Sequence, residues 1–199
     1  MTLAVCNALL DTAVSERTRL AAIEAARPDT LRGHPALMML LQEAAEEFRV
    51  PVAGVTLVGA ERQIALASCG APAEELETER AHSFCDHAIR TPDTLIVNDA
   101  TADPRFAANP FVTGGPQVRF YAGAPLWIGD AQAFGALCVI GFEPRMLSLV
   151  ERLRLRIYAT AAQEIVAQHA LTRDLLGMVS DTLQARFDAG SGAAAFGRG

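Results

Sequence analysis

The chain contains no lysine, and this absence removes two classes of chemistry. All 17 of its cationic residues are arginine. Walker-type phosphate loops and Schiff-base catalysis both need a lysine ammonium group, so neither fits this sequence. The net charge is −6, with acidic and basic residues interspersed. This argues against a nucleic-acid-binding surface, which would gather arginine on one face.

Long uninterrupted apolar segments are also missing. No run approaches the roughly 20 apolar residues that cross a bilayer. The N-terminal MTLAVCNALLDTAVSER lacks the positively charged start of a signal peptide. With 51% hydrophobic and 20% charged residues in 199 positions, the composition indicates a globular protein large enough for one domain with its own core. We therefore expect a cytoplasmic protein that binds no membrane.

Cysteine is scarce, and its spacing shows no pairing motif. Cys6, Cys69, Cys85 and Cys138 lie far apart in the sequence and form no CxxC pair. In a cytoplasmic protein this pattern favours reduced thiols that pack as small hydrophobic side chains. The sequence therefore predicts free, buried cysteines.

Helical periodicity marks both ends of the chain. Apolar positions recur at helical spacing over 14–27 and stop at Pro28, and a second helix is predicted over Pro35–Phe48, with proline in its favoured first turn. Helical character returns from Leu147 to about Phe187. The distal half of this last helix either pairs with another subunit or folds back onto its own domain. Its apolar residues are Leu171, Leu175, Met178, Val179 and Leu183.

Short apolar runs separated by turns predict strands between these helices. Two strands, 52–58 and 63–68, form a hairpin around the turn at 59–62. Three more are predicted over 94–98, 119–128 and 134–141, the last two joined at Gly129-Asp130. Antiparallel strands between terminal helices predict an α+β fold with a central sheet of five or six strands.

Four blocks between Ser83 and Gly141 carry the most specific information. They read SFCDHAI, LIVNDATADPRF, VRFYAGAPLWI and FGALCVIG, with short turns between them. In this order they resemble the GAF family of small-molecule sensor domains, in the branch common in bacterial signalling proteins. Upstream, NALLDT, FRVPVAGVTLV and ERQIALASCG fall where that branch has an N-terminal helix and its first two strands.

The resemblance implies an architecture and a role. The sheet would carry the N- and C-terminal helices on one face and a ligand pocket with short helices and loops on the other, as in GAF and PAS domains. The chain would divide into a helical extension (1–34), a sensor domain (35–172), a C-terminal helix extension (173–188) and a disordered tail (189–199). It would act without catalysis in signal transduction, as a homodimer through its terminal helices and through a signalling partner.

Two alternatives to this role stay open. One is a ligand-free dimerisation scaffold that uses the same helices as a docking surface. The other is a thiol-dependent reductase of free methionine sulfoxide, a branch of the fold whose glycine-rich and cysteine-bearing motifs are missing from this sequence. A pocket filled by its own aromatic side chains would favour the scaffold, and a roomy pocket would favour the sensor.

The block around Cys85 predicts a short helix. Ser83 and Asp86 have the spacing of a capping box, and Thr91-Pro92 ends the helix. Cys85 would lie in the first turn, where the helix dipole can lower a thiol pKa. It is either a ligand-contacting or redox-sensing thiol or a buried packing residue. Together with His82 and His87 it suggests a metal site, but helical residues two apart point about 200° away from each other, so we predict no metal.

The next block predicts part of the pocket wall. Asp103 and Pro104 have the pattern of a helix start. In GAF domains this segment borders the pocket, so the resemblance implies that Asp99 and Phe106 face a ligand. The long connection 105–119 has the size of a functional lid. It contains Phe111 and two prolines.

The strand after this connection alternates in its chemistry. Arg119 and Tyr121 fall on one face and Phe120 on the other. Arg119 either binds a carboxylate or phosphate or pairs with Asp99 or Asp103 to hold the loop. No catalytic residue is predicted. The predicted ligand-binding residues are Cys85, His87, Asp99, Phe106, Phe111, Arg119, Phe120 and Tyr121.

Two ligand classes of the family fit this sequence poorly. GAF domains that bind cyclic nucleotides share an Asn-Lys…Phe…Asp-Glu signature, which a chain without lysine cannot carry. Bilin-binding relatives attach their chromophore through a cysteine in a later segment than Cys85-Asp86-His87. The sequence therefore predicts a small-molecule ligand without naming it, and it names no cofactor.

Overall fold

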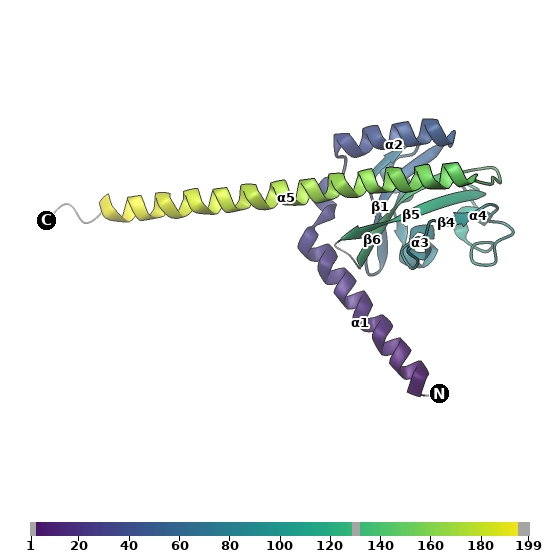
Figure 1. The fold of residues 1–199 in the computed structure, drawn as a ribbon, viewed down its shortest axis with the longest axis horizontal. Helices are drawn as coiled ribbons and strands as arrows, with labels where there is room; N and C mark the ends of the chain where they lie inside the picture. Colours follow the sequence, from purple (N-terminus) through teal and green to yellow (C-terminus); the bar gives the residue numbers. More distant parts are fainter. Residues whose placement is uncertain (1–2, 129–131, 195–199) are drawn as a thin grey trace.

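The computed structural model describes residues 3–128 and 132–194 (Figure 1). Its helices are α1 (Leu3–Ala26), α2 (Pro35–Phe48), α3 (Phe84–Ala88), α4 (Pro110–Thr113) and α5 (Leu149–Ala194). Its strands are β1 (Val52–Val58), β2 (Arg62–Cys69), β3 (Thr78–Glu79), β4 (Leu95–Val97), β5 (Phe120–Ile128) and β6 (Gln132–Gly141). Three short 3-10 turns are η1 (Pro28–Leu31), η2 (Ala73–Leu76) and η3 (Arg80–His82).

The local predictions agree with these elements in most places. The helix Pro35–Phe48 is confirmed at both ends, and the helix predicted over 14–27 is the second half of α1, which stops before Pro28. The helix start at Asp103-Pro104 was wrong, because 104–108 form turns rather than a helix. The turn at Gly129-Asp130 lies outside the described residues. α5 reaches Ala194, and the rest of the predicted tail, 195–199, also lies outside them.

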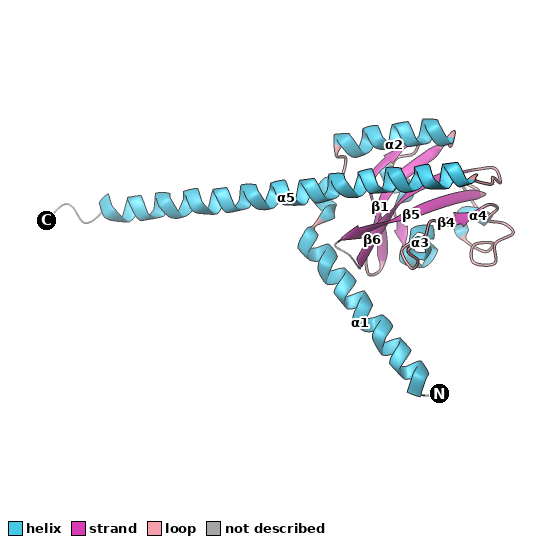
Figure 2. Cartoon of the chain, viewed as in Figure 1, coloured by secondary structure: helices cyan, strands magenta, loops and turns pink. Residues whose placement is uncertain are grey.

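The strands form one antiparallel sheet in the order β3-β2-β1-β6-β5-β4, drawn in magenta in Figure 2. In the centre of the sheet, Leu137 of β6 pairs with Val55 on one side and with Ala124 on the other. Two register shifts, at Val55/Thr56 and Leu126/Trp127, interrupt the ladders and add local twist. The predicted α+β fold is confirmed, with six strands among the described residues.

One face of the sheet is covered by α2 and the first half of α5, which lie side by side across the strands (Figures 1 and 2). The core between the helices and the sheet includes Phe48 of α2, Phe120 of β5 and Leu155 of α5, all essentially inaccessible to solvent. This burial of large apolar side chains supplies the main stabilisation of the domain.

The opposite face carries α3, α4 and their connecting loops. A second buried cluster lies there, and it includes Phe84, Cys85, Phe106, Tyr121 and Cys138. Because side chains alternate along a strand, Tyr121 points into this cluster while its neighbour Phe120 points into the helix-side core. The two faces of the sheet therefore have separate interiors.

The long terminal helices extend away from this domain in different directions (Figure 1). α5 has 46 residues, which at 1.5 Å per residue is about 70 Å. Arg173 still donates a hydrogen bond to the Ala26 carbonyl at 2.8 Å, but beyond that contact α5 projects past the sheet. The alternative in which the distal half folds back onto the domain was therefore wrong. Among the described helices, none is both long and apolar enough to span a bilayer.

Candidate functional site

A cavity of about 150 Å³ opens between α3 and the sheet face that α2 and α5 leave uncovered. Val52, Tyr121 and Cys138 contribute from the strands, Ser83 and Cys85 from the start of α3, and the remaining walls come from the β2–η3 connection and the loop around 111–118. Most of the lining is apolar. A cavity of this volume is large enough for a molecule the size of benzene.

Hydrogen bonds fix the start of α3 against β2. The Ser83 hydroxyl accepts from the Asp86 amide at 2.9 Å, which confirms the N-cap, and it donates to Gln63 Oε1 at 2.5 Å. Gln63 Nε2 in turn donates to the Leu76 carbonyl at 2.6 Å. The reciprocal half of the capping box is absent from the described contacts, because the Asp86 carboxylate binds arginines instead. These bonds place polar side chains along one edge of an otherwise apolar pocket.

Two thiols and a phenol meet on the pocket floor. The Tyr121 hydroxyl donates to Cys85 Sγ at 3.2 Å, and Cys138 lines the same pocket within the same buried cluster. Hydrogen bonds from Cys138, Thr56 and Tyr121 lower the pKa of Cys85 despite its burial. The hydrogen bond to Cys85, together with burial, raises the pKa of Cys138 well above its usual value. Cys85 is therefore the more acidic thiol of the pair.

Ring contacts with Phe106 and Tyr121 hold α3 in place. The rings of Phe84 and Phe106 stack with centroids 4.1 Å apart, and Phe84 also contacts Tyr121 at 5.1 Å. His87 packs edge-on against Phe106 at 4.8 Å, and burial, with the charge of Arg90, lowers its pKa. Phe106 and His87 were both predicted to contact a ligand, but neither lines the pocket. Their ring contacts stabilise the helix that carries Cys85.

The long loop closes one side of the pocket. Phe111, Pro116 and Val118 line the cavity. Arg119 donates to the carbonyls of Val112 at 3.0 Å and Val118 at 3.1 Å. Arg119 therefore holds the loop, which is one of its two predicted roles. It does so through hydrogen bonds to backbone carbonyls and not through an ion pair with Asp99 or Asp103.

Asp99 and Asp103 make turns at the base of this loop. Asp99 Oδ1 accepts from the Thr101 amide at 2.9 Å and the Thr101 hydroxyl at 2.7 Å. Asp103 accepts from the Arg105 amide at 3.0 Å and pairs with the Arg105 side chain. Neither carboxylate lines the cavity. The geometry therefore does not support the prediction that Asp99 faces a ligand.

The position of Phe120 requires a correction. Its ring is fully buried between the sheet and the helices, on the face opposite the pocket, so it is a core residue and cannot touch a ligand in the cavity. Of the eight predicted site residues, the structure brings Cys85, Phe111 and Tyr121 to the lining. The sequence analysis did not place Gln63, His82, Ser83 or Cys138 there, because their positions depend on pairing between distant segments.

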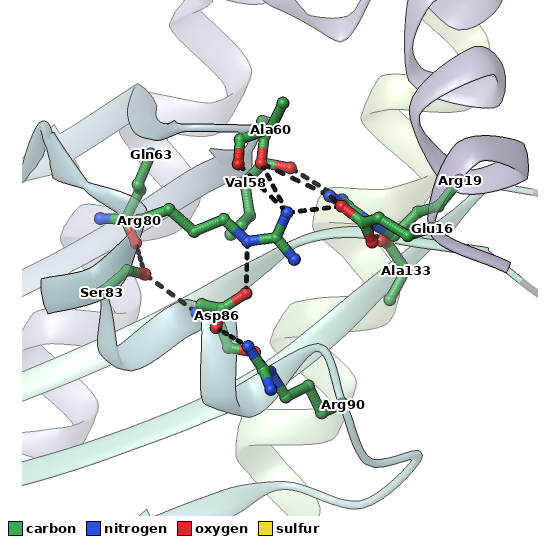
Figure 3. Close-up of polar contacts among 11 residues, drawn as sticks. Glu16, Arg19, Val58, Ala60, Gln63, Arg80, Ser83, Asp86, Arg90 and Ala133 are labelled. Carbon is green, nitrogen blue, oxygen red and sulfur yellow. Dashed lines mark hydrogen bonds and ion pairs between the residues drawn. The ribbon is translucent and has the colours of Figure 1, made fainter. Parts of the chain in front are cut away.

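A chain of ion pairs leads from α3 to α1 (Figure 3). The buried Asp86 carboxylate accepts from Arg80 Nε at 2.7 Å and from Arg90 at 2.5 Å. Arg80 also contacts Glu16 Oε1 at 2.5 Å, and Glu16 binds Arg19 on the next turn of α1 at 2.8 Å. Arg19 is itself buried and donates to the Val58 carbonyl at 2.7 Å. The residue after Cys85 is thus linked to the N-terminal helix.

Each carboxylate in this series of ion pairs lies beside guanidinium groups that balance its charge. Hydrogen bonds from Arg19, then from Arg80, lower the pKa of Glu16 to about 2 despite partial burial. Glu16 is therefore ionised at neutral pH and bridges two guanidinium groups. Among the described residues, no group of three or more His, Cys, Asp or Glu side chains could hold a metal ion.

The profile of the GAF domain family matches residues 33–167. The chain belongs to the GAF domain family. This GAF domain is 43% identical over 106 residues to a cyclic di-GMP phosphodiesterase from Pseudomonas aeruginosa, and the match covers 53% of the chain but 18% of that protein. The chain therefore spans about a fifth of the length of this curated relative.

Solved GAF structures share the fold at low sequence identity. The blue-light-absorbing PixJ GAF domain of Thermosynechococcus elongatus superposes with a TM-score of 0.59 at 15% identity, covering 84% of this chain and 95% of that one. The type II free methionine-R-sulfoxide reductase of Thermoplasma acidophilum gives 0.57 at 14% identity, covering 71% and 95%. These likenesses establish the architecture of this GAF domain, and its chemistry has to be argued from its own side chains.

Proposed function

We propose that this GAF domain is a non-catalytic sensor that holds one small, largely apolar molecule in the pocket beside α3. The observation that carries this proposal is the cavity itself, which remains open although Phe84 and Tyr121 lie at its edge. A pocket filled by its own rings would have favoured the scaffold. The polar edge formed by Gln63, His82 and Ser83 would orient a ligand with one or two polar groups.

The signal would leave the pocket through α3. A ligand that displaces α3 must move Asp86, and Asp86 is joined through Arg80 to Glu16 of α1. The ligand would shift α1 only insofar as it binds one arrangement of these elements more tightly than another. The pocket and the terminal helix therefore form a coupled pair in this proposal.

The terminal helices would deliver the signal to a second copy of the chain and to an effector. Val150, Ile157, Leu171 and Met178 are all more than half exposed. Multiples of seven residues separate them, as along one position of a coiled-coil heptad, with Glu164 at the intervening position. Such a stripe fits a homodimer along α5. The Pseudomonas relative suggests the effector class, an enzyme of cyclic di-GMP turnover.

Ligand-observed NMR with phenol as the probe tests the pocket. Ala71 lines the cavity and Ala108 is exposed on the loop outside it. We expect phenol to bind the wild-type chain and the control Ala108→Phe alike and to lose most of its affinity for Ala71→Phe, whose ring would fill the cavity. Equal binding by all three chains would refute the pocket assignment. Native mass spectrometry of freshly purified protein would show whether a natural ligand is retained.

The reductase alternative has one structural observation in its favour, the presence of Cys85 and Cys138 in the lining of one pocket. That chemistry needs an activated thiolate and a second thiol within reach. Incubation with free methionine sulfoxide and dithiothreitol separates the two functions. A sensor produces no methionine above the rate seen without protein, whereas a reductase produces it at a rate that Cys85→Ser abolishes.

A further inference from the structure

We propose that Cys85 and Cys138 form a peroxide-sensitive dithiol, which a hydroperoxide converts into an intramolecular disulfide across the pocket floor. This proposal goes beyond ligand sensing and does not depend on it. It assigns a reversible modification site to two residues that lie 53 positions apart in the sequence and that meet only in the folded chain.

The two thiols face the same cavity. Cys85 comes from α3 and Cys138 from the central strand β6, and both line the pocket. Each is almost fully buried, at 3% and 1% exposure, so a bulky reagent is excluded while hydrogen peroxide can enter the cavity. Both also belong to the same buried cluster on this face of the sheet, so bond formation requires the two sulfurs to approach to about 2 Å.

The surroundings of Cys85 favour its role as the attacking sulfur. The Tyr121 hydroxyl donates to Cys85 Sγ at 3.2 Å, and a donor of this kind stabilises a thiolate. Hydrogen bonding lowers the pKa of Cys85 and raises that of Cys138. Cys85 would therefore react first, and Cys138 would resolve the product.

Atoms and electrons balance in two steps. The Cys85 thiolate attacks one oxygen of the peroxide, the O–O bond breaks, and hydroxide leaves and takes up the thiol proton as water, which gives a sulfenic acid. Cys138 sulfur then attacks Cys85 sulfur, the S–O bond breaks, and a second water forms. The two thiols lose two electrons, hydrogen peroxide gains them, and a cellular thiol restores the reduced pair.

The remaining cysteines provide the controls. Cys69 is half-buried and packs against the helix-side core, away from the pocket cluster. Replacing Cys6 and Cys69 by serine leaves Cys85 and Cys138 as the only thiols of the chain. In this variant, every change in thiol content reports on the proposed pair.

Intact mass spectrometry of the Cys6→Ser/Cys69→Ser chain, treated with hydrogen peroxide and then alkylated under denaturing conditions, tests the proposal. We expect a mass loss of about 2 Da, no alkylated thiol, and full reversal by dithiothreitol. Adding Cys138→Ser should leave a sulfenic acid on Cys85 that dimedone traps. Adding Cys85→Ser should slow oxidation of the remaining thiol at least about tenfold.

Three results would overturn the proposal. One is two alkylated thiols after peroxide treatment of a chain whose circular dichroism shows it to be folded. Another is equal oxidation rates in the two single-cysteine chains. The last comes from peptide mapping of the peroxide-treated wild-type chain, which requires no variant to fold: a disulfide that joins Cys85 to any residue other than Cys138 contradicts the assignment. Loss of phenol binding alone would not bear on it.

Discussion

Arg80 Nε lies 2.7 Å from Asp86 Oδ1, and this ion pair joins the helix beside the pocket to the rest of the domain. Asp86 is almost completely buried, whereas Arg80 reaches the surface of the domain and contacts Glu16. A buried carboxylate needs such partners, because an unpaired charge in the interior is strongly destabilising. The contact therefore stabilises α3 and connects it to α1.

Removing the Arg80 guanidinium should destabilise the domain. We expect Arg80→Gln to lower the free energy of unfolding by about 1–3 kcal/mol, since it takes charged hydrogen bonds from both Asp86 and Glu16. Arg105→Gln is the matched control, because its pair with Asp103 lies on the pocket loop with Arg105 largely exposed, and it should cost less than about 1 kcal/mol. Urea denaturation measures both; equal losses would show that the Arg80 contacts contribute no more than a surface pair.

The contribution of Glu16 should depend on pH. Its pKa falls from 4.5 to about 2 in the folded chain, so ionised Glu16 stabilises the fold fully above pH 4.5, and the contribution is lost as the pH falls toward 2. The difference in unfolding free energy between the wild type and Glu16→Gln should therefore be largest near neutral pH and shrink below pH 4.5. A difference that stayed constant down to pH 2.5 would contradict the assigned ion pairs.

Truncation of Phe111 and of Phe120 should have different effects. Phe120→Ala removes a fully buried ring from the helix-side core and should cost about 3–5 kcal/mol of stability. Phe111→Ala removes a partly exposed ring from the pocket loop and should cost about 1 kcal/mol while it weakens phenol binding. Thermal unfolding and NMR titration measure the two effects. Unchanged phenol binding by a folded Phe111→Ala chain would remove the loop from the binding site.

The exposed apolar residues in the distal half of α5 should control self-association. Leu175 and Met178 are 54% and 67% exposed beyond the domain, and Leu175→Glu with Met178→Glu should place like charges in a dimer interface. We expect the dissociation constant of the dimer to rise at least tenfold, about 1.4 kcal/mol, in analytical ultracentrifugation. Ser180→Glu, which lies about 200° around the same helix from Met178, is the control and should leave it unchanged. A monomeric wild-type chain would refute the dimer.

Much of the fold follows from local patterns. The ends of α2 and the cores of β1, β2, β5 and β6 could be predicted because proline positions and the periods of apolar residues act over a few neighbouring residues. The N-cap of α3 at Ser83 could be predicted for the same reason, and the strand alternation correctly separated Phe120 from Tyr121. Local sequence therefore determined the elements and the order in which they occur.

The site depended on contacts that no local pattern contains. Alternation showed that Phe120 and Tyr121 face opposite sides of β5, but only the packing of α2 and α5 decided which side became core and which kept a cavity. The approach of Cys138 to Cys85 requires β6 in the sheet centre and α3 across it. Arg19 on α1 reached the Val58 carbonyl for a similar reason. Periodicity encodes which face of an element is apolar, whereas the partner of that face is chosen by the packing of the whole chain.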